Sequence, residues 1–244
     1  MNISIPERIS LGASDLRISP LGMGTNAWGF RNRGDPGKQP TLEAALATGI
    51  NFIDTAEVYL FGGSEKTLGL LLPEHRADVV LASKFFPYPW RLTKASLKAA
   101  LHASLQRLGV AQLDLYILHF PVPPVPLETC RELGVGLVAF RPLGYGLLTG
   151  KYKPEDLPAV LHGRLIRRSD LQRVSPLIEL LGKLGLSHDK TPAQVALNWI
   201  VCKGAVPIPG AKNPTQAAQN AGALGWRLEA GEVEALDREA ARLP

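Results

Sequence analysis

Four polar side chains in the first half of the sequence have types that could carry out general acid catalysis. Asp54 and Lys84 interrupt the apolar runs "NFIDTA" and "VVLASKF", Tyr59 follows Asp54 by five residues, and His119 ends the run "LDLYILH". A charge within an apolar strand is costly unless it is paired, so we expect Asp54 and Lys84 to pair. A Lys ammonium beside Tyr59 favours the phenolate, which lowers the tyrosine pKa from about 10 and suits it to proton donation near neutral pH. We expect His119 to orient a substrate oxygen or to share the proton.

Each of these residues taken alone has a common structural explanation. A histidine at a strand end is often simply hydrogen-bonded, an Asp-Lys pair is often an internal salt bridge, and a loop tyrosine often packs at a rim. The four together, in order along the chain, are a more specific pattern. Catalytic groups of a parallel barrel collect where its strands end.

Alternating short apolar strands and capped helices must position these residues, and they are typical of parallel βα units. An N-terminal β-hairpin is predicted in "RISLGASDLRISP", with its turn near Gly12–Asp15. We therefore expect an α/β fold of parallel strands and helices. A closed TIM-type (β/α)8 barrel needs eight parallel strands, so a barrel built from the six found here would be incomplete. The six predicted strands are residues 21–25, 52–56, 79–85, 113–119, 137–141 and 206–209.

Capping residues predict where the helices begin and end. Thr41 is expected near the start of one helix and Gly49 just past its end; Thr93 and Gly109 are expected to bound the next. In that second helix we expect an inner face of Leu97, Leu101, Leu105 and Leu108. Later helices are predicted to begin at Ser175-Pro176, Thr191-Pro192 and Asn213-Pro214.

The composition of the 244 residues excludes several classes of protein. The net charge is +5, but the basic residues are scattered and are densest only at 163–173, so we expect no nucleic-acid partner. No apolar run reaches the roughly 18 residues of a membrane span, and the N-terminus lacks a secretory pattern, so we expect a cytoplasmic protein with no membrane partner. Cys130 and Cys202 are too few for a disulfide framework and are expected to be core thiols. We predict no metal site, and the oligomeric state stays open.

The stretch "IPGAKNPTQAAQN" at residues 208–220 predicts an anion-binding site. It reads as a strand end, a glycine, a lysine and then an N-capped helix with Pro214 in its first turn. The free N–H groups of a helix N-terminus attract anions, and Lys212 adds a positive charge. This arrangement suits a phosphate group.

Five stretches resemble the aldo-keto reductase family, in the family's order: "GINFIDTAEVY", "LASKF", "LDLYILH", "PLGYGLLTGKY" and "PIPGAKNPTQAAQNAGALGW". The resemblance implies a single barrel domain over residues 1–244 that binds NADP(H) and transfers a hydride to a small-molecule carbonyl. In this interpretation Tyr59 is the general acid, Lys84 and Asp54 tune it, and His119 positions the carbonyl.

The resemblance also implies a set of cofactor contacts. Relatives commonly have Arg where Gln216 stands, an acidic residue where Gln219 stands, and Ser where Arg141 stands. Arg141 either helps to hold the pyrophosphate or obstructs the strand end. The implied cofactor-binding residues are Gly24, Thr25, Pro142, Leu143, Gly144, Gly146, Leu148, Gly210, Lys212, Asn213, Gln216 and Asn220.

One long segment of the family pattern is absent. The stretches "PPVPLE" and "CRELGVGLVAF", which the family keeps far apart, abut at Glu128–Cys130. The absent part would hold the fifth and sixth strands and the residues that grip the nicotinamide amide. Its loss is expected to expose strand edges and to lower turnover, because hydride transfer depends on positioning.

Trp28, Phe85 and Phe86 are predicted either to line the substrate pocket or to pack in the core.

Two hypotheses for function follow. The first is an NADPH-dependent aldehyde or ketone reductase. The alternative is a catalytically weak or inactive dinucleotide-binding regulatory homologue that keeps the phosphate contacts.

Overall fold

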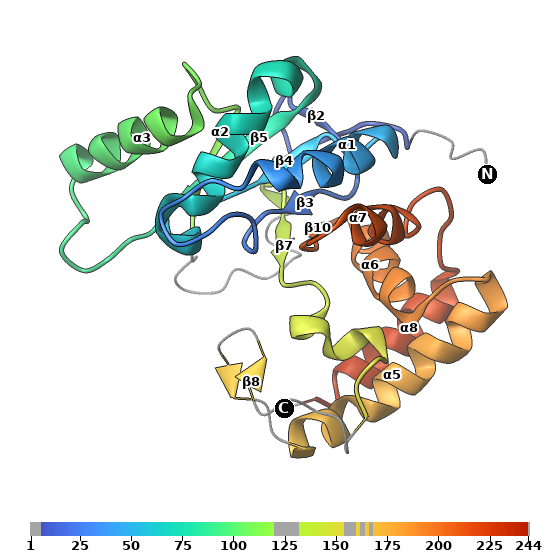
Figure 1. Ribbon diagram of the computed structural model, residues 1–244. Helices are drawn as coiled ribbons and strands as arrows, with labels where there is room; N and C mark the ends of the chain where they lie inside the picture. Colours follow the sequence, from blue (N-terminus) through green and yellow to red (C-terminus); the bar gives the residue numbers. More distant parts are fainter. Residues whose placement is uncertain (1–5, 120–131, 154–159, 162–163, 166–167, 244) are drawn as a thin grey trace. The chain divides into compact units, whose positions relative to one another are not determined.

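The computed structural model describes residues 6–119, 132–153, 160–161, 164–165 and 168–243 (Figure 1). By its internal contacts the chain divides into two compact units. We call residues 5–137 with 210–218 the N-terminal unit, and residues 1–4, 138–209 and 219–244 the C-terminal unit. The single barrel domain expected over residues 1–244 stays a prediction.

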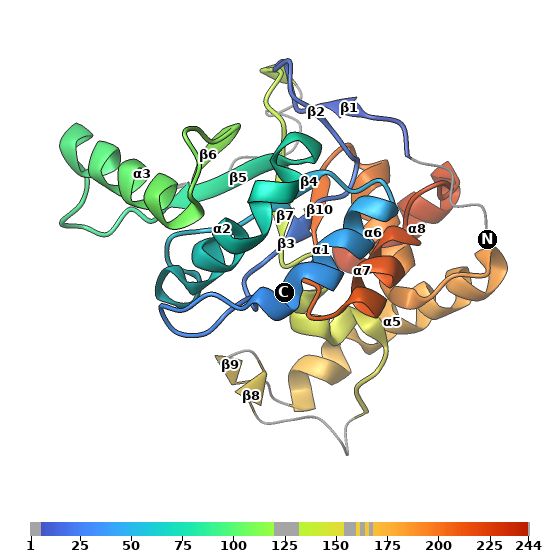
Figure 2. The same ribbon diagram turned by 45° about the horizontal axis from the view of Figure 1, so that its top comes forward.

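A four-stranded parallel sheet forms the centre of the N-terminal unit (Figure 2). Its strands, in spatial order, are β3 (Met23–Gly24), β4 (Phe52–Asp54), β5 (Val80–Phe85) and β6 (Leu115–Leu118). Every residue of β4 is buried, as are five of the six in β5, which suits parallel strands covered on both faces. Gly24 also pairs in parallel with Gly210, so the segment after residue 209 returns to the edge of this sheet.

The predicted N-terminal hairpin is confirmed. It pairs β1 (Ile9–Ser10) with β2 (Arg17–Ile18) in antiparallel register. Gly12 in its turn has φ +58°, and a Cβ there would lie 2.3 Å from the backbone nitrogen of Gly136. The Ala13 amide donates to the Gly134 carbonyl at 2.7 Å, so residues 134–136 lie against the turn. Only glycine suits position 12, because any side chain would be strained by the positive φ and would clash with the backbone of residues 134–136.

Three α-helices belong wholly to the N-terminal unit: α1 (Gln39–Ala47), α2 (Gly63–His75) and α3 (Lys94–Leu108). The expected boundaries of α3 are confirmed, because Thr93 forms a capping box and Gly109 closes the helix with φ +66°. Gly49 follows α1 with φ +83°, also as predicted. Short 3-10 turns precede or follow these helices, namely η1 (Pro36–Lys38), η2 (Tyr59–Gly62) and η3 (Arg76–Asp78).

Thr41 lies in the first turn of α1, near the start of the helix as predicted, and is buried. The residue that precedes the helix is Lys38, because η1 runs directly into α1. The predicted inner face of α3 is wrong in part. Leu108 is buried as predicted and Leu101 and Leu105 are half-buried, but Leu97 is 41 % exposed, and the other buried residues are Ala100 and Ser104. Small residues face inward because α3 packs closely on α2, where a Cβ on Gly69 would lie 2.6 Å from the Arg107 carbonyl oxygen.

The C-terminal unit contains a two-stranded parallel sheet of β7 (Val138–Phe140) and β10 (Val206–Ile208), and an antiparallel pair of β8 (Val160–Leu161) and β9 (Arg164–Leu165). Helix α5 (Arg168–His188) packs on α6 (Pro192–Cys202) and α8 (Ala230–Ala240) (Figure 1). Their apolar faces share a core that includes Leu181, Val195 and Leu236. The turn η4 (Gly144–Thr149) packs against α5 and α6. Helix α7 (Pro214–Ala221) begins in the N-terminal unit and ends in this one.

The predicted helix starts at Thr191-Pro192 and Asn213-Pro214 are confirmed, but the start at Ser175-Pro176 is wrong. Helix α5 begins at Arg168 and carries Pro176 in its interior. The Ser175 hydroxyl donates to the Leu171 carbonyl at 2.9 Å, one turn back within the helix, and therefore does not cap a helix start. Cys202 is a half-buried free thiol, while Cys130 lies outside the described residues.

All six predicted parallel strands are present, four in one sheet and two in the other. Among the described residues, β6 is hydrogen-bonded to β5 alone, so it is an edge strand of its sheet. The junction at Glu128–Cys130 lies outside the described residues. Within the described part of the chain, no helix combines the length and apolar character that crossing a membrane requires.

Candidate active site

Asp54, Lys84 and Tyr59 form one hydrogen-bonded group in the N-terminal unit. Asp54 ends β4, Lys84 stands near the end of β5, and Tyr59 begins the turn η2. The Lys84 ammonium donates to the Asp54 carboxylate, to the Thr55 carbonyl at 2.9 Å and to the Tyr59 hydroxyl oxygen at 3.2 Å. The expected Asp54–Lys84 pair is therefore present, and the same ammonium contacts Tyr59.

This ion pair is almost entirely removed from solvent. The Lys84 and Asp54 side chains are 6 % and 1 % exposed. Burial raises the pKa of Asp54, and the adjacent Lys84 ammonium opposes that rise. Oδ1 of Asp54 is buried and has no hydrogen-bond partner among the described residues, so the carboxylate depends on Lys84 for its stabilisation.

His119 follows β6 and completes the group of four. Its backbone N–H donates to the Phe85 carbonyl at 2.9 Å, which continues the pairing of β6 with β5. Its ring lies edge-on to the Tyr59 ring, with centroids 5.6 Å apart and an interplanar angle of 88°. The structure thus brings together all four side chains at the carboxyl ends of three adjacent parallel strands, where barrel enzymes place their catalytic groups.

A buried hydroxyl network underlies this group. Ser64 at the start of α2 lies 2.8 Å from the Thr25 hydroxyl and 2.9 Å from the Thr55 hydroxyl. Thr25 also donates to the Asp54 carbonyl at 3.0 Å. The side chain of Thr25, expected to contact a cofactor, is thus turned into this network. This hydroxyl network ties the ends of β3 and β4 to α2 and fixes the loop that carries Tyr59.

Glu57 is a residue of the site that the sequence reasoning missed. Its carboxylate accepts a hydrogen bond from the Phe86 amide at 2.8 Å and forms an ion pair with Arg91 at 3.0 Å. These contacts join the loop of Tyr59 to the loop that follows β5. An acidic residue between Asp54 and Tyr59 was a visible signal, but nothing in its spacing indicated the partner.

The three predicted pocket aromatics differ in the structure. Trp28 and Phe85 are buried core residues, with Trp28 fully covered. Phe86 is half-buried, and its ring centroid lies 5.5 Å from that of His119. Only Phe86 among the three therefore lies beside the group of four with partly exposed surface.

The segment predicted to bind an anion forms the start of α7 in the N-terminal unit. The Asn213 side chain accepts from the Gln216 amide at 2.9 Å and so caps the helix. The Gln216 side chain accepts from the Lys212 amide at 2.8 Å. The Lys212 side chain is exposed at this helix end.

The loop after β7 belongs to the C-terminal unit. Gly144, Tyr145 and Gly146 have φ of +55°, +61° and +91°, and Arg141 has φ +50°. The Arg141 guanidinium lies 4.6 Å from the Tyr145 ring centroid and contacts its hydroxyl. Leu143 and Leu148 pack on the core of α5, α6 and α8, so their side chains hold the loop in place. Of the remaining predicted contacts, Pro142 is half-buried beside Arg141 and Asn220 lies in the last turn of α7.

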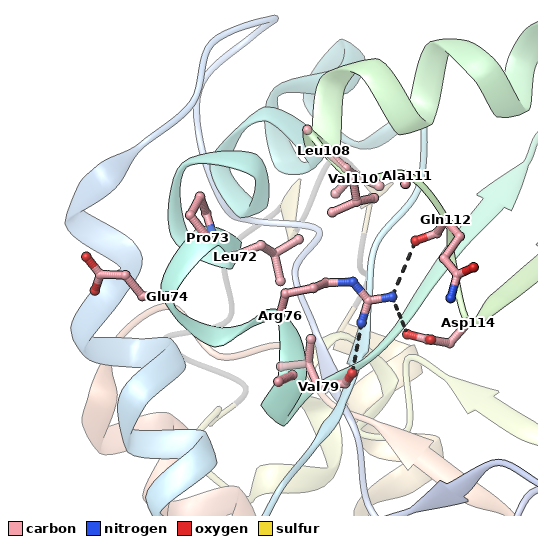
Figure 3. Close-up of a pocket in the computed structure, with 12 residues that line it drawn as sticks. Leu72, Pro73, Glu74, Arg76, Val79, Leu108, Val110, Ala111, Gln112 and Asp114 are labelled. Atoms are coloured by element: carbon pink, nitrogen blue, oxygen red, sulfur yellow. Dashed lines mark hydrogen bonds and ion pairs between the residues drawn. The ribbon is translucent and has the colours of Figure 1, made fainter.

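A surface recess lies at the opposite ends of the strands, where β5 and β6 begin (Figure 3). Arg76 extends across it, donating to the Val79 and Gln112 carbonyls and pairing with Asp114 at 2.9 Å. Asp114 in turn accepts from the Leu81 amide at 2.7 Å. Residues at this face of a barrel serve stability, and these contacts satisfy one another.

Comparison with known proteins identifies the family. The sequence pattern of the Aldo/keto reductase family matches residues 20–129 and 126–240. This chain belongs to the aldo/keto reductase family. It is 32 % identical to the chloroplastic pyridoxal reductase of Arabidopsis thaliana, covering 98 % of this chain and 87 % of that protein. It is 30 % identical to an uncharacterized oxidoreductase of Mycobacterium bovis, covering 90 % of this chain and 88 % of that one.

The same comparisons confirm that this aldo/keto reductase lacks an internal segment. The Arabidopsis alignment runs over 320 positions, more than the 244 residues present here, so the relative carries residues that this chain does not have. The family pattern matches in two pieces that meet at residues 126–129, which places the gap at the predicted junction.

Solved structures confirm the predicted fold class. Glycerol dehydrogenase of Gluconobacter oxydans superimposes with a TM-score of 0.77 at 23 % identity, covering 100 % of this chain and 97 % of that one. An aldo-keto reductase of Klebsiella pneumoniae, solved in complex with NADPH, superimposes with a TM-score of 0.71 at 21 % identity, covering 96 % and 95 %. The aldo/keto reductase barrel is thus the fold to which this chain's strands belong.

Proposed function

We propose that this chain is an NADP(H)-dependent carbonyl reductase that reduces aldehydes or ketones to alcohols. The observation that carries the proposal is the contact of the buried Lys84 ammonium with both the Asp54 carboxylate and the Tyr59 hydroxyl. A positive charge beside a phenol makes its proton easier to lose. The buried carboxylate keeps that charge in place.

Each of the four residues has a distinct role in this proposal. Tyr59 donates its proton to the carbonyl oxygen as negative charge develops there. Lys84 stabilises the resulting phenolate, Asp54 holds Lys84, and His119 orients the carbonyl oxygen beside the Tyr59 hydroxyl. NADPH, when bound, supplies the hydride that the carbonyl carbon accepts. Hydride and proton together convert the carbonyl to an alcohol.

The chemistry of the donor set at α7 fits the phosphate of such a cofactor. An exposed Lys212 ammonium and the positive end of the α7 helix dipole are suited to bind a phosphate. The bound NADPH of the Klebsiella relative and the substrate named for the Arabidopsis relative support the choice of cofactor and of a carbonyl substrate.

The absent segment favours a second candidate function. Relatives carry residues between the two matched pieces that this chain lacks, and the resemblance places the nicotinamide-holding side chains there. A chain with the phosphate contacts but without that grip would bind the dinucleotide and turn over slowly. In this second reading the protein is a dinucleotide-binding regulatory homologue.

Steady-state oxidation of NADPH, followed by absorbance with 4-nitrobenzaldehyde and with pyridoxal, separates the two candidates. Intact mass is measured on the same preparation to verify the 244-residue chain. Turnover that is lost in Tyr59→Phe supports the reductase. NADPH binding, followed by fluorescence, without turnover supports the regulatory homologue.

A further inference from the structure

The backbone that precedes α7 is held by side chains from the segment between β3 and α1. The Trp28 indole N–H donates to the Ala211 carbonyl at 2.6 Å. The Lys38 ammonium donates to the Lys212 carbonyl at 3.0 Å. Two successive carbonyls are thus bound by residues more than 170 positions earlier in the chain, all within the N-terminal unit.

The contact of Lys38 places a second ammonium beside the start of α7. Its side chain is 20 % exposed, so most of its length is covered while part of it reaches solvent. An ammonium has three donor hydrogens, and the bond to Lys212 uses one of them. The Lys38 ammonium also forms an ion pair with Oδ2 of Asp35 at 3.8 Å, while Oδ1 of Asp35 accepts from the Gly37 amide at 3.0 Å.

Gln216, on α7, brings no charge to this place. It is a neutral residue, and its side-chain oxygen is occupied by the Lys212 amide. The positive charge at this end of α7 therefore comes from Lys212 and Lys38, and the Asp35 carboxylate beside Lys38 offsets part of it. A doubly charged phosphate needs such cations, since charge-assisted hydrogen bonds are about twice as strong as neutral ones.

We infer that Lys38 is a specificity-determining residue of the cofactor site, acting with Lys212 on the 2′-phosphate to select NADPH over NADH. This inference rests on the proposed function. Because the two lysines lie far apart in the sequence, one on the turn before α1 and one before α7, the pair exists only in the folded N-terminal unit.

The test measures binding by calorimetry and needs no turnover. Lys38→Met removes the charge and keeps most of the covered chain. We expect this variant to bind NADPH and adenosine 2′-monophosphate about ten-fold more weakly. Its affinities for NADH and adenosine 5′-monophosphate should change less than about two-fold. Lys38→Arg should retain the preference of the unaltered chain for NADPH.

Lys66→Met is the matched control, because Lys66 also donates to a backbone carbonyl of the N-terminal unit, that of Asn32 at 3.2 Å, away from α7. It should leave all four affinities unchanged. Equal losses for NADPH and NADH in Lys38→Met would show that Lys38 only supports the backbone, and this result would overturn the inference. Unchanged NADPH affinity, or an unaltered chain that does not bind adenosine 2′-monophosphate, would overturn it as well.

The inference and the proposed function fail separately. If the unaltered chain reduces no carbonyl but Lys38→Met still loses the 2′-phosphate preference, the inference stands and the reductase proposal falls. If the unaltered chain reduces carbonyls and Lys38→Met keeps its NADPH preference, the inference alone falls.

Discussion

The Lys84 ammonium lies 3.2 Å from the Tyr59 hydroxyl oxygen. Lys84 stands near the end of β5, whereas Tyr59 lies in η2 beyond the end of β4, so the loop after β4 sets their separation. A proton donor fixed in this way needs little reorganisation to act. Its removal should therefore affect chemistry and leave binding intact.

Tyr59→Phe should lower kcat for carbonyl reduction by a factor of about 10² or more, because general acid catalysis typically contributes 10²–10⁴. The dissociation constant for NADPH should stay nearly unchanged. Stopped-flow turnover and fluorescence titration measure the two quantities. Wild-type turnover in the Phe variant would refute the assignment of Tyr59 as general acid.

Lys84→Met should destabilise the protein strongly, because it leaves the buried Asp54 carboxylate without its counter-charge. Breaking a buried ion pair on one side costs about 3–5 kcal/mol. The double variant Lys84→Met/Asp54→Asn should be more stable than Lys84→Met, since it removes both charges. Urea unfolding of the three proteins checks this order, and a double variant no more stable than the single one would contradict it.

The pH dependence of stability should reveal the raised pKa of Asp54. A carboxyl whose pKa is higher in the folded chain binds more protons there than in the unfolded chain, so its contribution to stability grows as pH falls from neutral towards its ordinary value of about 3.9. Relative to Lys84→Met/Asp54→Asn, the unaltered protein should gain stability over this range. A constant or shrinking difference in unfolding free energy would show that the pKa is not raised.

Lys212→Ala should weaken the binding of NADPH more than the binding of NADH. A hydrogen bond to a charged group contributes about 1.5–3 kcal/mol, so the preference for NADPH should narrow by roughly ten-fold or more. Fluorescence titration with both dinucleotides measures it. If the affinities for NADPH and NADH fall by the same factor, Lys212 does not contact the 2′-phosphate.

Gly12→Ala should destabilise the N-terminal unit by about 1–3 kcal/mol, because the residue has φ +58° and its Cβ would meet the backbone of residues 134–136. Gly182→Ala is the control, since Gly182 lies inside α5 with nothing within 4 Å of an added Cβ. That change should be neutral or stabilising by up to about 1 kcal/mol. Thermal unfolding of both variants decides, and equal melting temperatures would argue against strain at Gly12.

The proximity of Asp54, Lys84 and His119 could be predicted because parallel strands bring their carboxyl ends together, whatever the loops do. Glu57 and Lys38 could not be found in this way. Their partners lie on distant loops: Glu57 contacts the Phe86 amide and the Arg91 side chain, and Lys38 contacts the Lys212 carbonyl. Loop conformation leaves no periodic signal in sequence. Leu97 was assigned to the wrong face for a related reason. The leucine stripe of α3 is visible in the sequence. The small residues Ala100 and Ser104 face inward because α2 approaches closely, and this approach depends on Gly69 of α2, which the sequence of α3 does not show.

The hydrogen bond from Trp28 to Ala211 spans 183 residues of sequence. A ribosome making this chain will therefore have released β3, β4, β5 and β6 long before residues 210–218, which complete the same unit, emerge. Until then the Trp28 indole N–H and the outer edge of β3 have no native partner, and the whole of 138–209 must be synthesised in the interval. The N-terminal unit therefore stays incomplete during synthesis until residues 210–218, which include the start of α7, have emerged.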